Sequence, residues 1–574
     1  MKNIKSSIIL FTLVATLSGI SSCKRDILDV MPTDILTSEA IFQDSVLTEA
    51  YVLGRYVRAG GPFTFGRPLS QVWLGSITDE SIATYDNGSF SLVKGIISPE
   101  NSSFMANLWG ENYRGIRECN IALQNLDKAP MSDARKEWFK AEIRFIRAYR
   151  YHDLIVNYGG VPIMGDRVYM LSDTDLDSLY DRKPVQECIS YTVNELNTAA
   201  VGLEKSSKVF NIAWGRATKE AAMTLKSRLL LYAASPLYNE GKNGTATQWA
   251  AAAAAAKEVM DLKKFSLYTG GFAKLFLTEK TPEAIYERTF TTTSTHISME
   301  RQNGPNGFGG WAGNTPTQLL VDEFELIGPS DGVLPVLGYS DAEHMKPIIN
   351  PDAVALGYND KTNLYARRDP RFGEMILYNG IVHRGRPIET FLPGGLDSKD
   401  GNEPWNTSKT GYYPNKFLDP AKPVTSPPST AGTQPWKYMR YAEVLLNYAE
   451  AQNEAVGPDA TVYSAINQVR ARAGMPDIPA GLSQSEMRIR IRHERRIELL
   501  WEEHRFYDVR RWMIAPQTES LPVQGILPTK SGGVVTYERI KVFDRLWKDD
   551  YYWMPIPLAD IQASNGKLKQ NPGY

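Results

Sequence analysis

The sequence predicts a mainly α-helical protein, in which a scaffold of paired, tetratricopeptide-like helices carries a loop-rich insert of mixed α and β structure. Apolar residues recur three and four apart through residues 38–262 and again through 436–513, which is the spacing of amphipathic helices. Tyr441 to Gly474 also spans about one 34-residue helix–turn–helix period. The insert is predicted because Gly, Pro, Asn and Thr become frequent between residues 263 and 435 while helical spacing fades.

The chain begins with a segment that resembles a bacterial lipoprotein signal. Two lysines precede an apolar run, and small residues then lead to Cys23. We therefore expect residues 1–22 to be a signal peptide and residues 23–37 a tether that is lipidated at Cys23. The alternative is an ordinary secretory signal with an incidental cysteine. No later run is long enough to span a bilayer, so the lipid is expected to anchor the body to the membrane.

The N-terminal scaffold, residues 38–262, is predicted to consist mostly of paired helices. An alanine run from Ala250 to Ala256 favours helix and lets neighbouring backbones approach closely. The predicted helices cover residues 38–57, two segments between 105 and 158, and residues 185–203, 217–232 and 248–260. In the insert, residues 263–435, short β-like runs such as 284–291 are separated by turn signals.

Three helices are predicted in the first part of the C-terminal segment, residues 436–574. The first begins at Trp436, and the second ends at Gly474, a residue that accepts the left-handed conformation after a helix end. The third follows a capping-box pattern formed by Ser483 and Glu486 and runs to Trp512. Its apolar face is predicted to contain Ile489, Ile497, Leu500, Trp501, Val509 and Trp512.

The third helix carries many charges, and the pattern favours a solvated face of ion pairs. Glu486 with Arg490, Arg490 with Glu494, and Arg495 with Glu498 stand at the spacing that suits pairs within one helix. The aromatic-rich ends of the tail, residues 551–557 and 571–574, are expected to pack on the scaffold, because a free tail of this kind would promote aggregation.

Composition excludes some classes of partner. Lys plus Arg number 64 against 65 Asp plus Glu, so the net charge of −1 does not favour nucleic acid. The 12 Trp and 29 Tyr suit flat amphipathic ligands, although cores also use them. Besides Cys23 the chain has only Cys119 and Cys188, and both a disulfide and two buried thiols remain open.

The sequence lacks the motifs of common catalytic, metal and cofactor sites. His493 and Glu494 begin like a zincin helix, but Ile497 stands where the second histidine is required. Residues 307–312 fit a dinucleotide pattern without the preceding strand. There is also no phosphate-binding Gly-Lys-Ser/Thr loop. We predict no catalytic residue, no metal and no cofactor.

A surface glycosidase is the enzyme alternative, because two suitably spaced carboxylates leave little trace in a single sequence. Each available carboxylate also fits an ordinary surface or capping acid. The candidates are Asp79, Glu80, Asp322, Glu323 and Glu325. Release of reducing ends from candidate polymers would separate this enzyme from a binding protein.

Several segments resemble the SusD/RagB family, the nutrient-binding lipoproteins of the Bacteroidetes outer membrane. The resemblance covers nearly the whole chain except its middle. It is carried by RYAEVLLNYAEA, INQVRARAG, IRHERRIELLWEEHRFYDVRRW and YYWMPIPLADIQASNGKLKQNPGY, and upstream by residues 141–154, 158–162 and 230–239.

The resemblance implies superhelical packing of the helices and a protein that is not an enzyme. It also implies a lid on a TonB-dependent, SusC-like transporter, which captures a ligand at the cell surface and hands it to the barrel. Family members are associated mainly with glycans and some with peptides, so a peptide ligand remains an alternative.

A glycan site should combine exposed aromatic rings with short polar side chains on loops. A pyranose stacks its C–H face on a ring, while its hydroxyl groups need polar partners. We rank Trp311 first and Trp73 second, and core packing is the alternative for every ring. The candidate ligand-binding residues are Trp311 and Asn314 in a glycine-rich loop, Trp73, Asp79 and Tyr85 in an early loop, and Trp405 in a polar loop.

Overall fold

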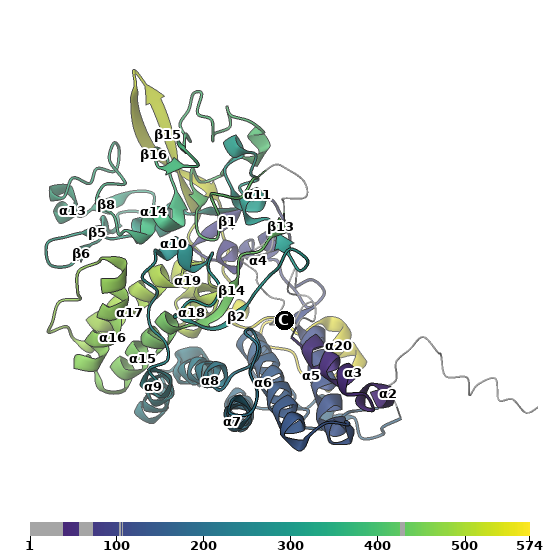
Figure 1. The fold of residues 1–574 in the computed structure, drawn as a ribbon. Helices are drawn as coiled ribbons and strands as arrows, with labels where there is room; N and C mark the ends of the chain where they lie inside the picture. The colour runs from purple at the N-terminus through teal and green to yellow at the C-terminus, as the bar shows by residue number, and fades with distance from the viewer. Residues whose placement is uncertain (1–37, 57–72, 103–104, 106, 171, 425–430) are drawn as a thin grey trace, which may run out of the picture.

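The structure is a computed structural model that describes residues 38–56, 73–102, 105, 107–170, 172–424 and 431–574 (Figure 1). The predicted signal peptide and tether, including Cys23, lie outside these residues. The described chain is mainly helical, with short strands concentrated in its middle, which confirms the predicted fold class. Among the described residues, no helix combines the length and apolar character that a membrane span requires.

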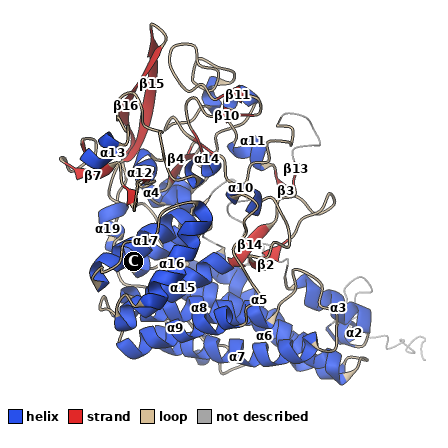
Figure 2. Cartoon of the chain, turned by 60° about the vertical axis from the view of Figure 1, so that its left-hand side comes forward, coloured by secondary structure: helices blue, strands red, loops and turns tan. Residues whose placement is uncertain are grey.

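Eight helices form one continuous array, in which each packs on a neighbour (Figures 1 and 2). The array continues from the N-terminal to the C-terminal scaffold, since α9 packs directly on α15 although the insert separates these two helices in sequence. Their bounds are α5 (Leu108–Asn125), α6 (Asp133–Tyr158), α7 (Val185–Ser207), α8 (Lys219–Ala234), α9 (Ala246–Asp261), α15 (Tyr441–Val456), α16 (Ala460–Ala473) and α17 (Gln484–Glu498).

Local chemistry explains where these helices begin, end and touch. Thr245 and Gln248 form a capping box at the start of α9, and Ser483 and Glu486 form the predicted one at the start of α17. Gly474, at φ 76°, ends α16 as predicted. A Cβ atom on Gly202 of α7 would lie 2.6 Å from the Ala141 Cβ of α6, so glycine permits the close packing of these two helices.

The helix predicted over residues 38–57 is two helices, α2 (Ser38–Phe42) and α3 (Ser45–Gly54). Asp44 begins the second one, because its carboxylate accepts hydrogen bonds from the Val46 and Leu47 N–H groups at 2.7 and 2.9 Å. The remaining helices are short: α4 (Ser89–Val93), α10 (Phe272–Leu275), α11 (Met299–Asn303), α12 (Gln318–Asp322), α13 (Pro351–Ala355), α14 (Arg371–Met375), α18 (His504–Arg511), α19 (Ala515–Thr518) and α20 (Leu558–Ala563).

Every sheet of the described residues has two antiparallel strands. β15 (Val523–Ser531) and β16 (Val534–Phe543) form a long hairpin that projects at the top of Figure 1 and that the sequence prediction did not include. The other pairs are β1 (Ser81–Ala83) with β4 (Asn314–Pro316), β2 (Ala284–Arg288) with β14 (Trp436–Arg440), β3 (His296–Ile297) with β13 (Ala431–Gly432), β5 (Leu326–Ile327) with β6 (Gly332–Val333), β7 (Val336–Tyr339) with β8 (Pro347–Ile349), β9 (Ile376–Leu377) with β12 (Tyr413–Pro414), and β10 (Val382–His383) with β11 (Arg386–Pro387).

Two predictions about the C-terminal helices are wrong. Residues 436–440 form strand β14 because they pair with β2 of the insert, so the first helix starts at Tyr441. The third predicted helix breaks between α17 and α18, where Trp501 and Glu503 adopt left-handed φ angles of 58° and 68°. Ile489, placed on the apolar face by its spacing, is 67% exposed.

The prediction of a solvated charged face is also wrong, because most charges of α17 and α18 are buried among partners from other elements. At the end of β14, Arg440 donates hydrogen bonds at 2.6 Å to Glu283, Glu498 and Glu502. The intrahelical pairs do not form as predicted, since Arg495 instead bonds Asp508 at 2.7 Å.

The C-terminal tail lies against the scaffold, as predicted. Tyr551, Met554 and Ile556 are buried. The Asn571 side chain donates to the Tyr158 carbonyl of α6 at 3.2 Å and to the Met554 carbonyl at 2.8 Å. The two cysteines that the sequence left open, Cys119 and Cys188, are buried free thiols.

Candidate ligand-binding site

The short β1–β4 ladder brings two of the predicted rings to one place. Ala83 pairs with Asn314, and the next residue, Thr84, bonds the Gly313 carbonyl through its N–H at 3.0 Å. Tyr85 and Trp311 therefore leave the same end of this ladder on opposite strands. Both side chains are half-buried.

Trp405 joins Tyr85 through the backbone of its own loop. The Tyr85 hydroxyl donates to the Trp405 carbonyl at 3.1 Å and also contacts the Asn406 side chain. The Asn406 amide in turn donates to Glu403 at 2.6 Å, which holds the loop in place. The Trp405 ring itself is 70% exposed, so its faces are open to solvent.

Trp311 is held by the short helix α11. Its N–H donates to the Arg301 carbonyl at 2.8 Å, and the Arg301 guanidinium carbon lies 4.9 Å from the ring centroid. The glycines before Trp311 permit a tight loop, because a Cβ on Gly310 would lie 2.1 Å from the Gly304 carbonyl oxygen. Sequence reasoning missed Arg301, since nothing in its neighbourhood distinguishes it from an ordinary surface arginine.

Asn306 connects the Trp311 loop to the Trp405 loop. Its side-chain amide donates to the carbonyls of Ser398 and Asn402 at 3.0 and 2.7 Å. Its side-chain oxygen accepts a bond from the buried Tyr413 hydroxyl at 2.8 Å. The three aromatic residues Tyr85, Trp311 and Trp405 are thus carried by cross-linked loops, and we call them the aromatic triad.

Three predicted site residues lie in the interior instead. Trp73 is 1% exposed and packs against the Phe417 and Trp501 rings, with centroid distances of 5.9 and 5.3 Å. Asn314 is also 1% exposed, and its side-chain oxygen accepts a 2.6 Å bond from Ser76. Both side chains are buried and support the loops, which corrects the prediction that they are exposed.

Asp79 is likewise a buried structural acid. Its carboxylate accepts bonds from Arg505 at 2.8 and 2.7 Å and from Arg496 at 2.8 Å. Burial opposes its ionisation, but these arginines outweigh burial and hold the pKa of Asp79 well below its usual range. Among the described residues no arginine forms such a bond with the neighbouring Glu80, and burial together with the Asp79 charge raises the pKa of Glu80 to about 8.

The other candidate acids of a glycosidase are also engaged by arginines. Asp322 pairs with Arg539 at 2.6 Å, and Glu325 pairs with Arg470 at 2.9 Å. Glu323 pairs with Arg496 at 2.6 Å. Among the described residues, no three His, Cys, Asp or Glu side chains are grouped to hold a metal ion.

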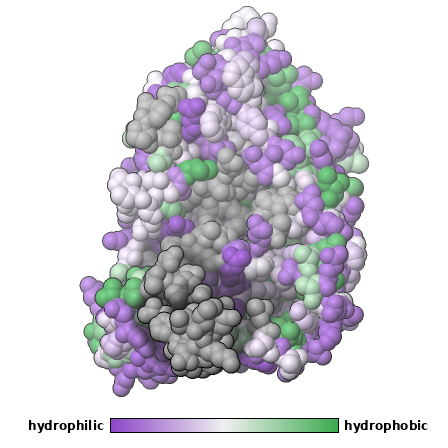
Figure 3. All heavy atoms as spheres, turned by 90° about the vertical axis from the view of Figure 1, so that its right-hand side faces the viewer, coloured by the Kyte–Doolittle hydropathy of each residue, from purple (hydrophilic) through white to green (hydrophobic). Residues whose placement is uncertain are grey.

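One face of the molecule carries both hydrophilic and hydrophobic residues (Figure 3). Figure 3 shows the right-hand side of Figure 1, where hydrophilic residues predominate and hydrophobic ones occur in small separate groups outside the grey atoms. Isolated exposed rings beside polar groups fit a small polar ligand with apolar faces.

Family models match most of the chain. The model of the SusD family matches residues 282–574. A second model, described as starch-binding and associating with the outer membrane, matches residues 27–231. The helical scaffold with loop-borne aromatic residues is therefore that of a known class of proteins. The chain belongs to the SusD family.

Curated relatives and solved structures agree with this assignment. SusD-like protein P2 of Formosa agariphila is 24% identical and covers 99% of this chain and 100% of its own. The starch-binding protein SusD of Bacteroides thetaiotaomicron is 23% identical, with 98% of each chain covered. A SusD-like protein of Bacteroides fragilis has a similar structure, with a TM-score of 0.75, 26% identity, and 95% of this chain and 100% of that chain covered.

Proposed function

We propose that this protein binds glycans at the cell surface and delivers them to a TonB-dependent, SusC-like outer-membrane transporter. The observation that carries the proposal is the aromatic triad, in which the open Trp405 ring stands beside Tyr85 and near the Trp311 loop. Membership of the SusD family supports the same function, because one matching family model is described as starch-binding and associating with the outer membrane.

The aromatic triad suits a sugar for physical reasons. The C–H face of a pyranose buries apolar area on an indole or phenol ring without losing the hydrogen bonds of its hydroxyl groups. Asn402 and Glu403 shortly precede Trp405 and supply a donor and acceptors for those hydroxyl groups. Because hydrogen bonds hold the loops before a ligand arrives, little conformational entropy is lost on binding.

Binding without catalysis is part of the proposal. The acids considered for a glycosidase are either buried or tied to arginines, and none of them belongs to the aromatic triad. The lipid on Cys23 would tether the protein to the outer membrane, which would place the aromatic triad within reach of extracellular glycans and of the transporter.

The test is a glycan and peptide array probed with the wild-type protein and two variants. Trp405→Ala removes the most exposed ring of the aromatic triad. Trp214→Ala is the matched control, because Trp214 is 42% exposed in the turn before α8, where its indole N–H donates to Glu287 at 2.6 Å. We expect oligosaccharides to bind the wild type and the control but not Trp405→Ala. Selective binding of peptides, or release of reducing ends from the bound glycans, would contradict the proposal.

A further inference from the structure

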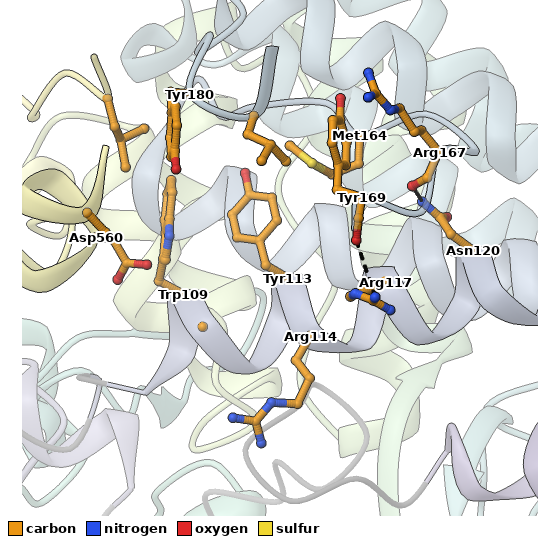
Figure 4. A pocket seen from close by; sticks show the side chains of 14 residues that line it. Trp109, Tyr113, Arg114, Arg117, Asn120, Met164, Arg167, Tyr169, Tyr180 and Asp560 are labelled. Atoms are coloured by element: carbon orange, nitrogen blue, oxygen red, sulfur yellow. Dashed lines mark hydrogen bonds between the residues drawn. The ribbon is translucent and has the colours of Figure 1, made fainter. Parts of the chain in front are cut away.

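A cavity lies between α5, the connection from α6 to α7, and α20 (Figure 4). Its volume is about 440 Å³, within the range of roughly 300–1,000 Å³ that is common for ligand pockets. The side chains around it are mostly apolar and aromatic. Trp109 and Tyr113 come from α5, Tyr169 and Tyr180 from the connection, and Asp560 from α20.

The aromatic side chains form the walls of a slot. Figure 4 shows Trp109 and Tyr180 on one side, Tyr169 on the other, and Tyr113 between them. Trp109 is 4% exposed and packs against the Tyr113 ring with centroids 4.9 Å apart. The Tyr113 hydroxyl donates to the Pro162 carbonyl at 3.0 Å. These contacts hold the Trp109 and Tyr113 rings in position.

Two polar groups stand at opposite ends of the slot. Asp560 lies at the Trp109 end, and Arg117 lies at the Tyr169 end, where it donates to the Tyr169 carbonyl at 3.2 Å (Figure 4). Within the described part of the chain, neither Asp560 nor Arg117 forms an ion pair. Burial raises the pKa of Asp560, as expected for a carboxylate that lacks a cationic partner.

The other two arginines beside the cavity already have acidic partners. Arg114 pairs with Glu111 at 3.2 Å, and Arg167 pairs with Asp173 at 3.2 Å. The charges left to a ligand are therefore one carboxylate and one guanidinium. A neutral ligand with donors at one end and acceptors at the other matches this balance, because a net charge of either sign would be attracted at one end and repelled at the other.

The slot is separate from the aromatic triad. In Figure 1, α5 and α20 lie in the lower half of the molecule, whereas β1 and α11 lie in the upper half. Tyr85 follows β1 by two residues, and α11 holds Trp311. Figure 2 shows the same separation of α5 from α11. No residue of the slot belongs to the aromatic triad, so each site can be disabled alone.

We propose that this slot is a second carbohydrate subsite that takes a neutral pyranose unit. It rests on the proposed function, since it assigns the same ligand class to a second place on the chain. The C–H groups of the sugar ring pack on the tyrosine rings that line the slot, Tyr113, Tyr169 and Tyr180, while Trp109 supports Tyr113 from behind. A hydroxyl donates to Asp560, and Arg117 donates to oxygens at the opposite edge.

The test uses saturation-transfer NMR with the methyl glycosides of glucose, galactose, mannose and xylose at millimolar concentration. The double variant Trp311→Ala/Trp405→Ala silences the aromatic triad and isolates the slot. We expect at least one glycoside to receive transfer from this double variant. Adding Tyr180→Ala or Asp560→Asn should lower that transfer by at least about fivefold, which at an unchanged ligand concentration corresponds to a loss of about 1 kcal/mol.

Asp133→Asn is the control, because the Asp133 side chain is 98% exposed on α6. Thermal unfolding confirms that each variant is folded, and Asp560→Asn serves if Tyr180→Ala does not fold. Absence of transfer from the triad double variant to every glycoside overturns the second subsite and leaves the aromatic triad unaffected. In the wild type, transfer that is lost in Asp560→Asn and Tyr180→Ala but unchanged in the double variant Trp311→Ala/Trp405→Ala supports the subsite and refutes the triad. Binding of phenylacetate in place of every glycoside also overturns the proposal.

Discussion

Replacing Glu498 by glutamine tests whether the buried charges hold the insert on the helical scaffold. Glu498 is fully buried and accepts hydrogen bonds from Arg440 at 2.6 Å, from Arg371 at 2.9 Å and from Arg472. Glutamine keeps the size of the side chain but removes its charge. Three buried guanidinium groups then share fewer carboxylates, and breaking a buried pair in this way costs about 3–5 kcal/mol.

The assay is equilibrium urea unfolding followed by tryptophan fluorescence at neutral pH. We expect Glu498→Gln to lower the free energy of unfolding by about 3–5 kcal/mol. The control is Asp261→Asn, which breaks the exposed pair between Lys257 and Asp261 at 2.7 Å and should cost less than about 1 kcal/mol. Equal small losses in both variants would refute the argument that the buried network stabilises the fold.

The stability of Glu498→Gln relative to the wild type should also depend on pH. The surrounding arginines hold the pKa of Glu498 well below its usual range, against the opposing effect of burial. A lowered folded-state pKa contributes stability that is complete above the unfolded-state pKa, about 4.3 for glutamate. The stability gap between the wild type and Glu498→Gln should therefore narrow as pH falls below that value. A gap that widens in acid would contradict the sign of this effect.

Three further predictions concern other parts of the chain. Trp73→Ala should lower the free energy of unfolding by about 3–5 kcal/mol, measured in urea, because it empties a packed core position. Glu80→Gln should stabilise the protein increasingly from about pH 4.3 to about pH 8. In the wild type, Glu80 ionises in the unfolded state above about pH 4.3 but stays protonated in the folded state up to about pH 8, and this difference lowers the free energy of unfolding. A pH series of thermal midpoints without this trend would contradict the prediction. Cys23→Ala should move the protein from the membrane fraction to the soluble fraction, and unchanged fractionation would count against the lipid anchor.

Features that depend on neighbouring residues were predictable from the sequence. The Ser483 capping box and the Gly474 helix end follow from residues within a few positions, and both are present. The helical scaffold follows from periodicity, because burying one face of each helix is what drives its packing. The packing of the C-terminal tail on the scaffold was also predictable, since exposing so many aromatic residues to water is unfavourable.

Features that depend on distant partners were not predictable. The charges of α17 form a solvated helical face by spacing alone, yet Arg371 and Arg440 approach from the insert and from β14. Trp436 has the apolar character of a helix start but belongs to a strand, because β2 pairs with it from the insert. Such contacts join residues far apart in sequence, and one-dimensional periodicity carries no information about them.

Which residues form the candidate site was also not predictable from local sequence alone. Trp73 and Trp405 both stand in polar or glycine-containing loops, but one is 1% exposed and the other 70% exposed. Their sequences do not distinguish them, because burial of Trp73 depends on Phe417 and Trp501 from distant segments. Tyr85 and Trp405 were separate candidates, and the hydrogen bond between them places both in one site.

Calorimetric titration of the oligosaccharide selected by the array tests the central claim most directly. The wild type is compared with Trp311→Ala and with the control Trp214→Ala. Glycan binding by the aromatic triad predicts that Trp311→Ala weakens affinity at least about 30-fold, about 2 kcal/mol. Its thermal midpoint should stay within about one degree, because the half-buried ring contributes little to the core. Unchanged affinity in Trp311→Ala, or an equal loss in Trp214→Ala, would contradict the claim.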